Sequence, residues 1–185
     1  MENQDRRSWE LDSRTIQRAL DRDTSALGQI YDACARPIYR YLYSRVENAA
    51  DAEDLTSQTF MAVIEALPRY RHRNHFKAWV FQIARNKLAD HFRGNHPHGE
   101  MHEWVADPAQ VDLLETVDRN ESHAKLKSLL HSLDQEEREL IRLRYTAELS
   151  FVEIAHLLGR REDAIRKAVR RILDRLSIQM EAQNA

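Results

Sequence analysis

The chain has 185 residues, of which 31% are charged and 42% hydrophobic, and it contains only four glycines and four prolines. Runs of Arg, Glu, Leu and Ala with so little glycine and proline favour helix over strand, and the length allows one domain or two small ones. The formal net charge of -2 argues against a uniformly basic nucleic-acid coat. We therefore expect an all-α protein.

The first helices follow from apolar residues that recur at steps of three and four. A short acidic helix is expected over residues 13–20, and a longer helix follows with Thr24 or Ser25 as its N-cap. Pro37 falls inside the longer helix and should bend or divide it. The inward residues of the longer helix are Leu27, Ile30, Tyr31, Cys34, Ile38, Tyr39, Leu42, Tyr43 and Val46.

A second long helix is expected to start near Asp51, to cover DAEDLTSQTFMAVIEAL and to stop at Pro68. A third covers NHFKAWVFQIARNKLADHFRG, with Asn74 as its N-cap and Gly94 as its end. A short basic loop, residues 69–75, lies between the two helices. The expected inward residues are Leu55, Phe60, Val63, Ile64 and Leu67 of the second helix and Phe76, Trp79, Val80, Ile83, Ala84 and Leu88 of the third.

Helical periodicity is lost over GNHPHGEMHEWVADPAQVD, as in a tether between domains. We therefore predict a domain over residues 1–94, a flexible linker over residues 95–121 and a second domain over residues 122–185. Trp104 and Val105 are an apolar pair in this linker that is either incidental or docks on a partner. A segment loosened by glycine and proline does not hold metal ligands rigidly, so no metal site is expected at His96, His98, His102 and Glu103.

The second domain shows the pattern of a helix-turn-helix. Asp134 with Glu137, and Ser150 with Glu153, indicate capping boxes that open two helices. Gly159 then separates SFVEIAHLLG from a longer basic helix, which is the helix-turn-helix order. The inward residues are Leu126, Leu129, Leu130, Leu133, Leu140, Ile141 and Leu143 of the first part and Ala164, Ile165, Ala168, Val169, Ile172 and Leu176 of the basic helix.

In a helix-turn-helix the first turn of the second helix meets base edges in the major groove, while basic residues on its outer side hold phosphates. The leading-turn residues are Arg160, Arg161, Glu162 and Asp163, and the outer residues are Arg166, Lys167, Arg170 and Arg171. A basic helix is often only a solvated face, but the preceding capped helix and glycine turn favour DNA binding.

Charge alternates in blocks along the chain. Residues 47–65 carry five acids and no Lys or Arg, whereas residues 69–93 carry seven Lys or Arg against Asp90 alone. Residues 94–121 are acidic again, and residues 160–175 are basic. The two basic blocks predict two polyanion contacts, and the acidic blocks predict at least one cationic protein partner.

The sequence resembles a known family, the extracytoplasmic-function (ECF) sigma factors of bacterial RNA polymerase. Region 4 of that family is similar to SLDQEERELIRLRYTAELSFVEIAHLLGRREDAIRKAVRRILDRL. Region 2 is similar to IYDACARPIYRYLYSRVENAADAEDLTSQTFMAVIEAL followed by FKAWVFQIARNKLADHFR. The two regions occur in the family's order and are joined by a tether, so the resemblance covers most of the chain.

The resemblance implies that the DAED helix docks on the clamp helices of the polymerase beta-prime subunit. It assigns core-polymerase binding to Asp51, Glu53, Asp54, Leu55 and Gln58. The alternative left open is that Asp51 is only an N-cap and that Glu53 and Asp54 only favour the helix dipole.

The resemblance also implies that the basic loop and the third helix capture an unstacked base of the minus-10 promoter element and hold the strand's phosphates. The residues assigned to minus-10 DNA are Arg71, Arg73, Asn74, His75, Lys77, Arg85, Asn86, Lys87 and Arg93. Trp79 could stack on a base, but its place on the apolar stripe favours a core position. The second domain would read minus-35 duplex through the leading turn and the outer side of its basic helix. The residues assigned to minus-35 DNA are Arg160, Arg161, Glu162, Asp163, Arg166, Lys167, Arg170 and Arg171.

The chain departs from the family's usual pattern in two places. Thr56, Ser57, Gln58, Thr59 and Phe60 stand where many relatives have T-Q-E-V-F, which removes one carboxylate from the expected core contact. Arg160 and Arg161 stand where relatives often cap the recognition helix with Ser or Thr. The promoter sequence therefore cannot be taken from a relative.

The function that we predict is promoter-specific initiation without catalysis by the chain itself. The expected partners are core polymerase, through beta-prime and beta, promoter DNA and an anti-sigma factor, and the free protein is expected to be a cytoplasmic monomer without membrane insertion. Neither a phosphate-binding glycine loop nor a catalytic triad pattern occurs, so we expect no enzyme activity and no cofactor. The alternative is a helix-turn-helix regulator that acts as a homodimer without core polymerase.

Overall fold

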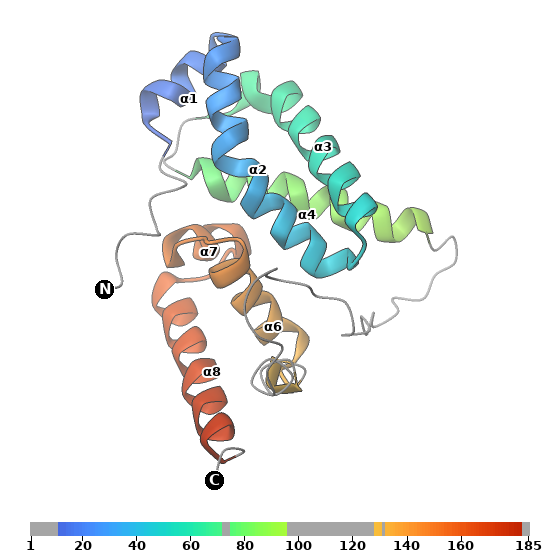
Figure 1. Cartoon of the computed structure of the whole chain (residues 1–185). Helices are drawn as coiled ribbons and strands as arrows, with labels where there is room; N and C mark the ends of the chain where they lie inside the picture. Colours follow the sequence, from blue (N-terminus) through green and yellow to red (C-terminus); the bar gives the residue numbers. More distant parts are fainter. Residues whose placement is uncertain (1–10, 72–74, 96–127, 131, 183–185) are drawn as a thin grey trace. The chain divides into compact units, whose positions relative to one another are not determined.

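The computed structural model describes residues 11–71, 75–95, 128–130 and 132–182, and the regular structure within these ranges is helical throughout (Figure 1). The expected all-α class is confirmed. The chain divides into two compact units, one within Met1–Trp104 and one within Val105–Ala185, and each is described separately. Asn95, the first residue of the predicted linker, belongs to a helix, and the rest of that linker, with Trp104 and the histidines at 96, 98 and 102, lies outside the described residues.

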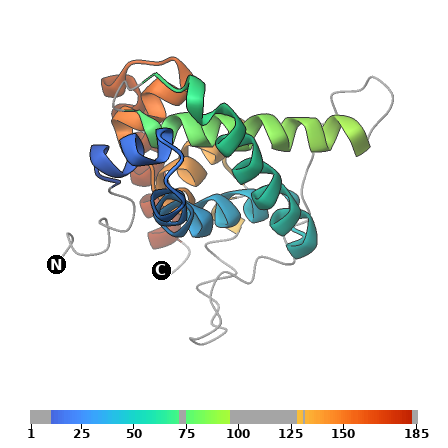
Figure 2. The same cartoon turned by 90° about the horizontal axis from the view of Figure 1, so that it is seen from above.

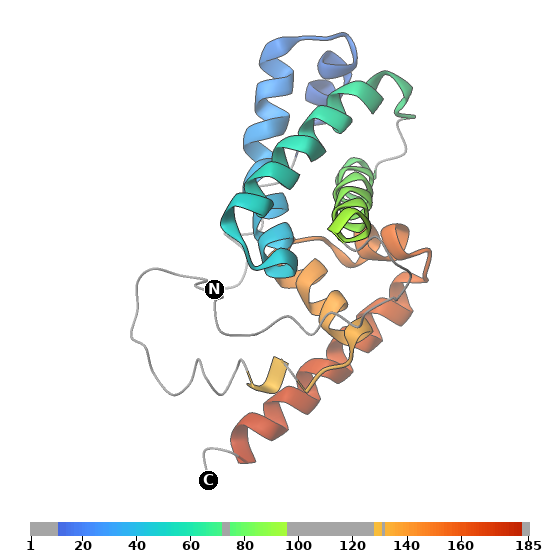
Figure 3. The same cartoon turned by 90° about the vertical axis from the view of Figure 1, so that its right-hand side faces the viewer.

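The first unit consists of α1 (Ser13–Leu20), α2 (Thr24–Val46), α3 (Ala49–Ala66), a 3-10 turn η2 (Leu67–Arg69) and α4 (Phe76–Asn95). Helix α2 packs against α1, α3 and α4, and α3 packs against α4. Figure 2 shows α4 lengthwise, and Figure 3 views it almost along its axis. The largest side chains buried at the centre are Tyr41, Phe81, Ile38, Leu42 and Leu55.

Side-chain caps fix where α2 and α3 begin. The N-cap of α2 is Asp23, which accepts from the backbone N–H groups of Ser25 and Ala26, so the expected cap at Thr24 or Ser25 is wrong. The N-cap of α3 is Asn48, whose side chain accepts from the N–H of Asp51 at 3.1 Å. Asp51 is therefore a first-turn acid and not a cap.

Several expectations for the first unit need correction. Helix α1 has the expected bounds, but it contains no acidic residue and is therefore not the acidic helix that was expected. The acid next to it, Asp12, is its N-cap. Pro37 lies within α2 without dividing it, and Gly94 lies within α4, which ends one residue later. Burial raises the pKa of the Cys34 thiol to about 12, in agreement with its interpretation as a buried hydrophobe.

The second unit contains α6 (Gln135–Ile141), a π-helical segment η4 (Arg142–Thr146), α7 (Phe151–Leu158) and α8 (Glu162–Ala182). Both predicted capping boxes are confirmed, Asp134 with Glu137 at α6 and Ser150 with Glu153 at α7. Gly159 has φ 63°, and the N–H groups of Gly159 and Arg160 donate to carbonyls of the last turn of α7. This left-handed position favours glycine and sets the turn between α7 and α8.

Buried side chains of α6, η4, α7, α8 and the turn before α7 form the core of the second unit. They are Leu140, Leu143, Leu149, Ile154, Ile165, Val169, Ile172 and Leu176. Two ion pairs connect α6 to the helix-turn-helix. Glu137 accepts from Arg175 at 2.5 Å, and Glu136 accepts from Arg160. The Glu137 side chain is only 13% exposed and raises the pKa of Arg175 through that hydrogen bond, so this pair fixes α8 on α6.

Candidate functional site

The outer face of α3 carries the acidic residues that the sequence assigned to a protein partner. Glu53, Asp54 and Gln58 are exposed and Asp51 is half-buried. The Gln58 side-chain amide donates to Asp54 at 2.6 Å, one helical turn away. Leu55 is 1% exposed and lies in the core, so among the five assigned residues it can only support this face from beneath.

Apolar side chains continue the exposed face of α3, and sequence reasoning missed them. Met61 is 64% exposed and Ile64 is 52% exposed, although Ile64 was expected to face inward. Tyr31 of α2 was also expected to be buried but is 51% exposed, with its ring 4.7 Å from the buried ring of Phe60. We call Tyr31, Met61 and Ile64 the apolar patch. Large exposed apolar side chains beside acids are typical of a protein-binding surface.

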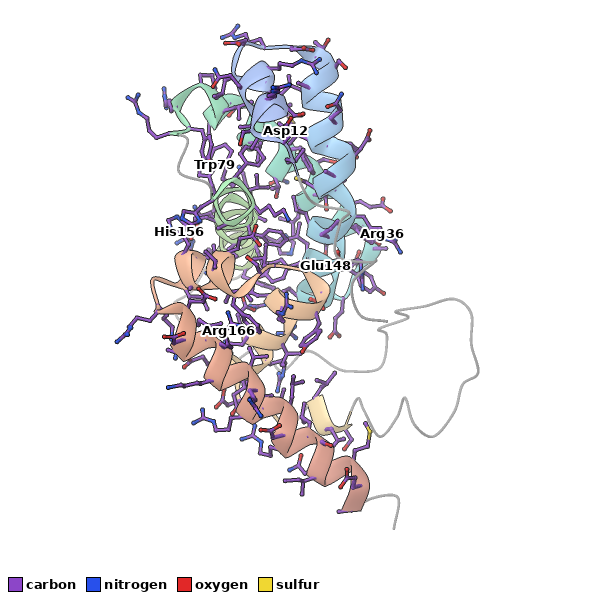
Figure 4. All side chains as sticks on the ribbon, turned by 90° about the vertical axis from the view of Figure 1, so that its left-hand side faces the viewer. Asp12, Arg36, Trp79, Glu148, His156 and Arg166 are labelled. Atoms are coloured by element: carbon purple, nitrogen blue, oxygen red, sulfur yellow. The ribbon has the colours of Figure 1, made fainter. Side chains whose placement is uncertain are left out.

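The basic loop begins and ends at an aromatic cluster. The ring of Tyr70 lies 4.8 Å from Trp79 and 5.3 Å from Phe76, and Phe76 lies 5.5 Å from Trp79. Phe76 is buried, whereas Tyr70 and Trp79 are half-buried. Figure 4 marks Trp79 near the start of α4. The predicted core position of Trp79 is thus half right, because the ring packs on its neighbours while part of it faces solvent.

The residues assigned to minus-10 DNA do not form a single strip. Lys77 and Asn86 are nine residues apart, about two and a half turns, so they lie on opposite sides of α4. Lys77 is half-buried, whereas Asn86 is exposed. Among the assigned residues, Arg71, Asn86 and Arg93 are exposed, whereas His75, Arg85 and Lys87 are half-buried. Arg73 and Asn74 lie outside the described residues.

The outer side of α8 does bring its assigned residues together. Arg161, Asp163, Arg166, Lys167, Arg170 and Arg171 are all exposed over the turn and the first three turns of the helix. Ile165, Val169 and Ile172 are buried on the opposite side, as expected. Ala164 is exposed, contrary to expectation. The result is a basic surface on a helix whose inner side is fixed by its core.

The cations of α8 differ in their partners. Arg160 pairs with Glu136, Arg166 pairs with Glu162, and the Arg170 Nε lies 4.0 Å from Asp174. Within the described residues, Arg161, Lys167 and Arg171 have no acidic partner. The latter three are therefore the cations whose charge is most available to a polyanion, because no intramolecular ion pair must break first.

A further cation lies beside the helix-turn-helix and was not selected from the sequence. The Arg144 Cζ is 4.7 Å from the ring centroid of Phe151, and the Arg166 Cζ is 4.9 Å from the same centroid. Figure 4 marks Arg166 in the first turns of α8. The signal that could have found Arg144 is its spacing from the α7 capping box, but only the folded turn brings it to Phe151.

The ranges that the structure describes contain no cluster of three or more His, Cys, Asp or Glu side chains that could hold a metal ion. No helix within them has the length and apolar character needed to cross a membrane.

Two family models match the chain. The model described as Sigma-70 region 2 matches residues 30–97, and the model described as Sigma-70, region 4 matches residues 129–177. The first match covers α2 from Ile30 onward together with α3 and α4, and the second covers α6, α7 and the first four turns of α8.

Relatives with curated descriptions agree with these matches. The ECF RNA polymerase sigma factor BldN of Streptomyces coelicolor is 33% identical over 157 residues, which cover 82% of this chain and 59% of BldN. SigD of Mycobacterium tuberculosis is 30% identical over 178 residues, covering 90% of this chain and 82% of SigD. ShbA of Streptomyces griseus is 34% identical over 178 residues, covering 87% of this chain and 91% of ShbA.

Solved structures share the fold. CnrH, solved in complex with the cytosolic domain of CnrY, superposes with a TM-score of 0.65 at 24% identity, over 91% of this chain and 96% of CnrH. The sigma factor RpoE of Bartonella quintana, solved with the anti-sigma factor NepR, gives a TM-score of 0.57 at 22% identity, over 83% of this chain and 96% of that chain.

Proposed function

The chain belongs to the ECF sigma factors of the sigma-70 superfamily, and on that premise we propose how its surfaces direct RNA polymerase to a promoter. The acidic face of α3 binds core polymerase on the clamp helices of beta-prime. The basic loop and α4 bind the opened minus-10 strand, and α8 reads minus-35 duplex. The observation that carries the proposal is the order of two matched regions on two helical units, the second of which is a basic helix-turn-helix.

The site residues divide by their accessibility. On α3, Glu53, Asp54 and Gln58 make the polar contact and the apolar patch extends it, while Asp51 and Leu55 shape the helix. On α8, the accessible cations Arg161, Lys167 and Arg171 hold phosphates. An Arg or Lys that forms no ion pair within the protein can bind a phosphate and release a counterion from DNA without breaking such a pair first. Arg160 and Arg166 already form ion pairs with Glu136 and Glu162, so these pairs must weaken before the two arginines can bind phosphate.

The chain contributes binding, and the nucleotide chemistry takes place in the polymerase. Flipping a base out of the stack costs a few kcal/mol, which contacts in the minus-10 loop must offset. The half-exposed edge of the aromatic cluster, Tyr70 and Trp79, supports this role because rings next to such a loop give an unstacked base a surface. An anti-sigma factor, the polymerase beta subunit, a cytoplasmic location and a monomeric free state complete the proposal.

The proposal is tested by in vitro transcription with core polymerase, the full chain and a library of randomised promoters. The expected result is a set of initiated transcripts that share one minus-35 and one minus-10 sequence. Core polymerase alone is the control, and a chain in which Arg161, Lys167 and Arg171 are all changed to Gln should initiate far fewer transcripts, because it loses three phosphate contacts. A library without any initiated transcript above the control would overturn the proposal.

Binding to core polymerase separates this function from that of a homodimeric helix-turn-helix regulator. Size-exclusion chromatography of the free chain is expected to give a monomer, and mixing with core is expected to give a 1:1 complex. A regulator of that kind has no role for the region 2 match over residues 30–97. A stable homodimer that does not bind core would support the regulator instead.

A further inference from the structure

Two amide side chains on the outer side of α4 are joined by a hydrogen bond. The Gln82 Nε2 donates to the Asn86 Oδ1 at 3.0 Å, one helical turn away, and both residues are exposed. Asn86 is among the residues assigned to minus-10 DNA, whereas Gln82 is not. A hydrogen bond between exposed amides at this spacing adds little to helix stability, so its main effect is on the orientation of the two side chains.

The bond gives the Asn86 amide one orientation. Its oxygen is turned toward Gln82, so its nitrogen, which carries two N–H donors, is turned away. The next acid on this side of the helix, Asp90, accepts from Arg93, and within the described residues no acceptor bonds the Asn86 nitrogen. The two donors of this nitrogen are therefore available to a ligand.

The amide pair follows the aromatic cluster along one side of α4. Trp79 precedes Gln82 by three residues and Gln82 precedes Asn86 by four, so the three side chains share a side of the helix. Side chains of an α-helix lean toward its N-terminus, so both amides lean toward the Trp79 ring. That ring is half-buried and lies 4.8 Å from the ring of Tyr70. One side of α4 thus presents an aromatic ring followed by oriented polar groups.

A protein that captures an unstacked base needs both kinds of group, because it stacks the face of the base on a ring and reads the edge by hydrogen bonds. We propose that Gln82 is a positioning residue for minus-10 recognition, which turns the Asn86 nitrogen toward the captured base. The promoter position read by Asn86 then favours thymine or guanine, whose exocyclic oxygens accept, over adenine and cytosine, whose amino groups donate. This inference rests on the proposed function and adds Gln82 to the residues that determine promoter choice.

The test compares base preferences at the minus-10 element in transcription from the randomised library, with core polymerase and variants of the full chain. Asn86→Ala identifies the position that Asn86 reads, as the one whose preference is lost. At that position the unchanged chain should favour thymine or guanine. Gln82→Met keeps the length of the side chain but removes the hydrogen bond, and should reduce the preference about three- to tenfold.

Gln82→Glu tests the orientation itself. A carboxylate can only accept, so it should bond the Asn86 nitrogen and leave the Asn86 oxygen turned outward. The preference should then move toward adenine or cytosine, a change that loss of helix stability does not produce. The added negative charge lowers binding to DNA of any sequence, so the total number of transcripts should also fall. In a chain that already carries Asn86→Ala, Gln82→Glu should leave the base preference as it is.

Gln17→Met is the matched control, because it makes the same change at an exposed position of α1. It should alter neither the base preference nor the number of transcripts. Affinity for core polymerase should be equal in all the variants, and urea unfolding checks that each is folded. Gln82→Ala replaces Gln82→Met if the latter is unfolded.

The outcomes distinguish this inference from the function on which it rests. Absence of initiated transcripts from the unchanged chain contradicts the proposed function. Normal initiation together with a base preference that Gln82→Met and Gln82→Glu leave unaltered overturns the inference alone. It is also overturned if Asn86→Ala loses preference at no position, or if the unchanged chain favours adenine or cytosine there. An equal shift with and without Asn86 overturns it as well, because Gln82 would then contact the base directly.

Discussion

The carboxylate of Asp23 accepts hydrogen bonds from a side chain and from the backbone at once. Arg18 Nε donates to it at 2.7 Å, and the N–H groups of Ser25 and Ala26 donate to its other oxygen. The hydrogen bond from Arg18 is the largest cause that holds the pKa of Asp23 below its usual value of 3.8, and the hydrogen bond from Ala26 is next. A single residue therefore joins the end of α1 to the start of α2.

This lowered pKa predicts an acid-dependent loss of stability. A carboxyl group whose pKa is lower in the folded chain stabilises it above the unfolded pKa, and that contribution is lost as the pH falls through the folded pKa. Asp23→Asn keeps an N-cap but removes the titration. We expect its melting temperature to fall less than that of the unchanged chain between about pH 5 and about pH 3. Equal falls in both proteins, measured by circular dichroism, would contradict this.

The capping box of α7 gives a second residue-scale prediction. The Ser150 hydroxyl accepts from the Glu153 N–H at 3.2 Å while the Glu153 carboxylate accepts from the Ser150 N–H at 2.7 Å. Ser150→Ala removes the first bond and should lower the free energy of unfolding by about 1 kcal/mol. Ser150→Thr retains the hydroxyl and should cost much less. Urea denaturation of the two variants makes the comparison, and equal losses would show that the hydroxyl does not stabilise the helix.

At the scale of elements, α3 combines an inner face that packs with an outer face that none of the described helices covers. Thr56 and Thr59 are buried on the inner side, and their hydroxyl groups donate to the carbonyls of Ala52 and Leu55. These internal bonds let polar residues enter the core without an unsatisfied donor. Met61 and Ile64 lie on the other side, where the described part of the chain leaves them exposed.

We expect Met61→Ser to weaken binding to core polymerase by about tenfold, because the variant loses apolar area that docking would bury. The melting temperature should stay close to that of the unchanged chain, since the side chain is 64% exposed. Glu181→Gln, an exposed change at the end of α8, is the control. Unchanged core affinity, measured with labelled protein, would remove the apolar patch from the interface.

Helix α8 offers a comparison between two arginines on one element. Arg171 has no acidic partner among the described residues, whereas Arg175 donates to Glu137. Arg171→Gln should lower the salt slope of minus-35 binding by about one, and Arg175→Gln should leave that slope nearly unchanged. Affinities measured at several salt concentrations decide the matter. Equal slopes in the two variants would mean that internal pairing does not determine which cations reach DNA.

The elements that sequence predicts best are those whose ends are set by local chemistry. Both capping boxes and the turn at Gly159 need only residues within four positions of each other, so spacing alone identifies them. The outer basic side of α8 followed from the same local periodicity. The cap of α2 was misplaced by one residue because Asp23, Thr24 and Ser25 are all good caps, and Arg18 favours the first of them.

The parts that sequence did not predict depend on contacts between helices. Phe81 is fully buried against Tyr41, with ring centroids 5.5 Å apart, but periodicity along α4 gave no reason to select it. Ile64 and Tyr31 fit the apolar stripes of their helices and are nevertheless exposed, because none of the helices that the structure describes covers these two side chains. Periodicity indicates which residues can be buried, whereas tertiary packing determines which ones are.

At the scale of the whole molecule, each unit has a core of its own. Residues 1–104 and residues 105–185 form separate compact units, with Tyr41 and Phe81 central to one and Leu140 and Ile165 central to the other. We expect the two halves, produced separately, to fold, and their urea transitions to sum to that of the full chain. A half that shows no cooperative transition on its own would mean that its core needs the other half.

The buried thiol makes the full chain easy to label at chosen places. Cys34 is the single cysteine of the sequence, it is inaccessible, and its pKa of about 12 leaves almost no thiolate to react with a maleimide at neutral pH. Gln17→Cys and Ile178→Cys, both at exposed positions outside the proposed interfaces, can therefore take up a pair of fluorophores while the native thiol stays in place. Energy transfer between the dyes would then follow the separation of the two units as the protein moves from free solution to polymerase and on to promoter DNA.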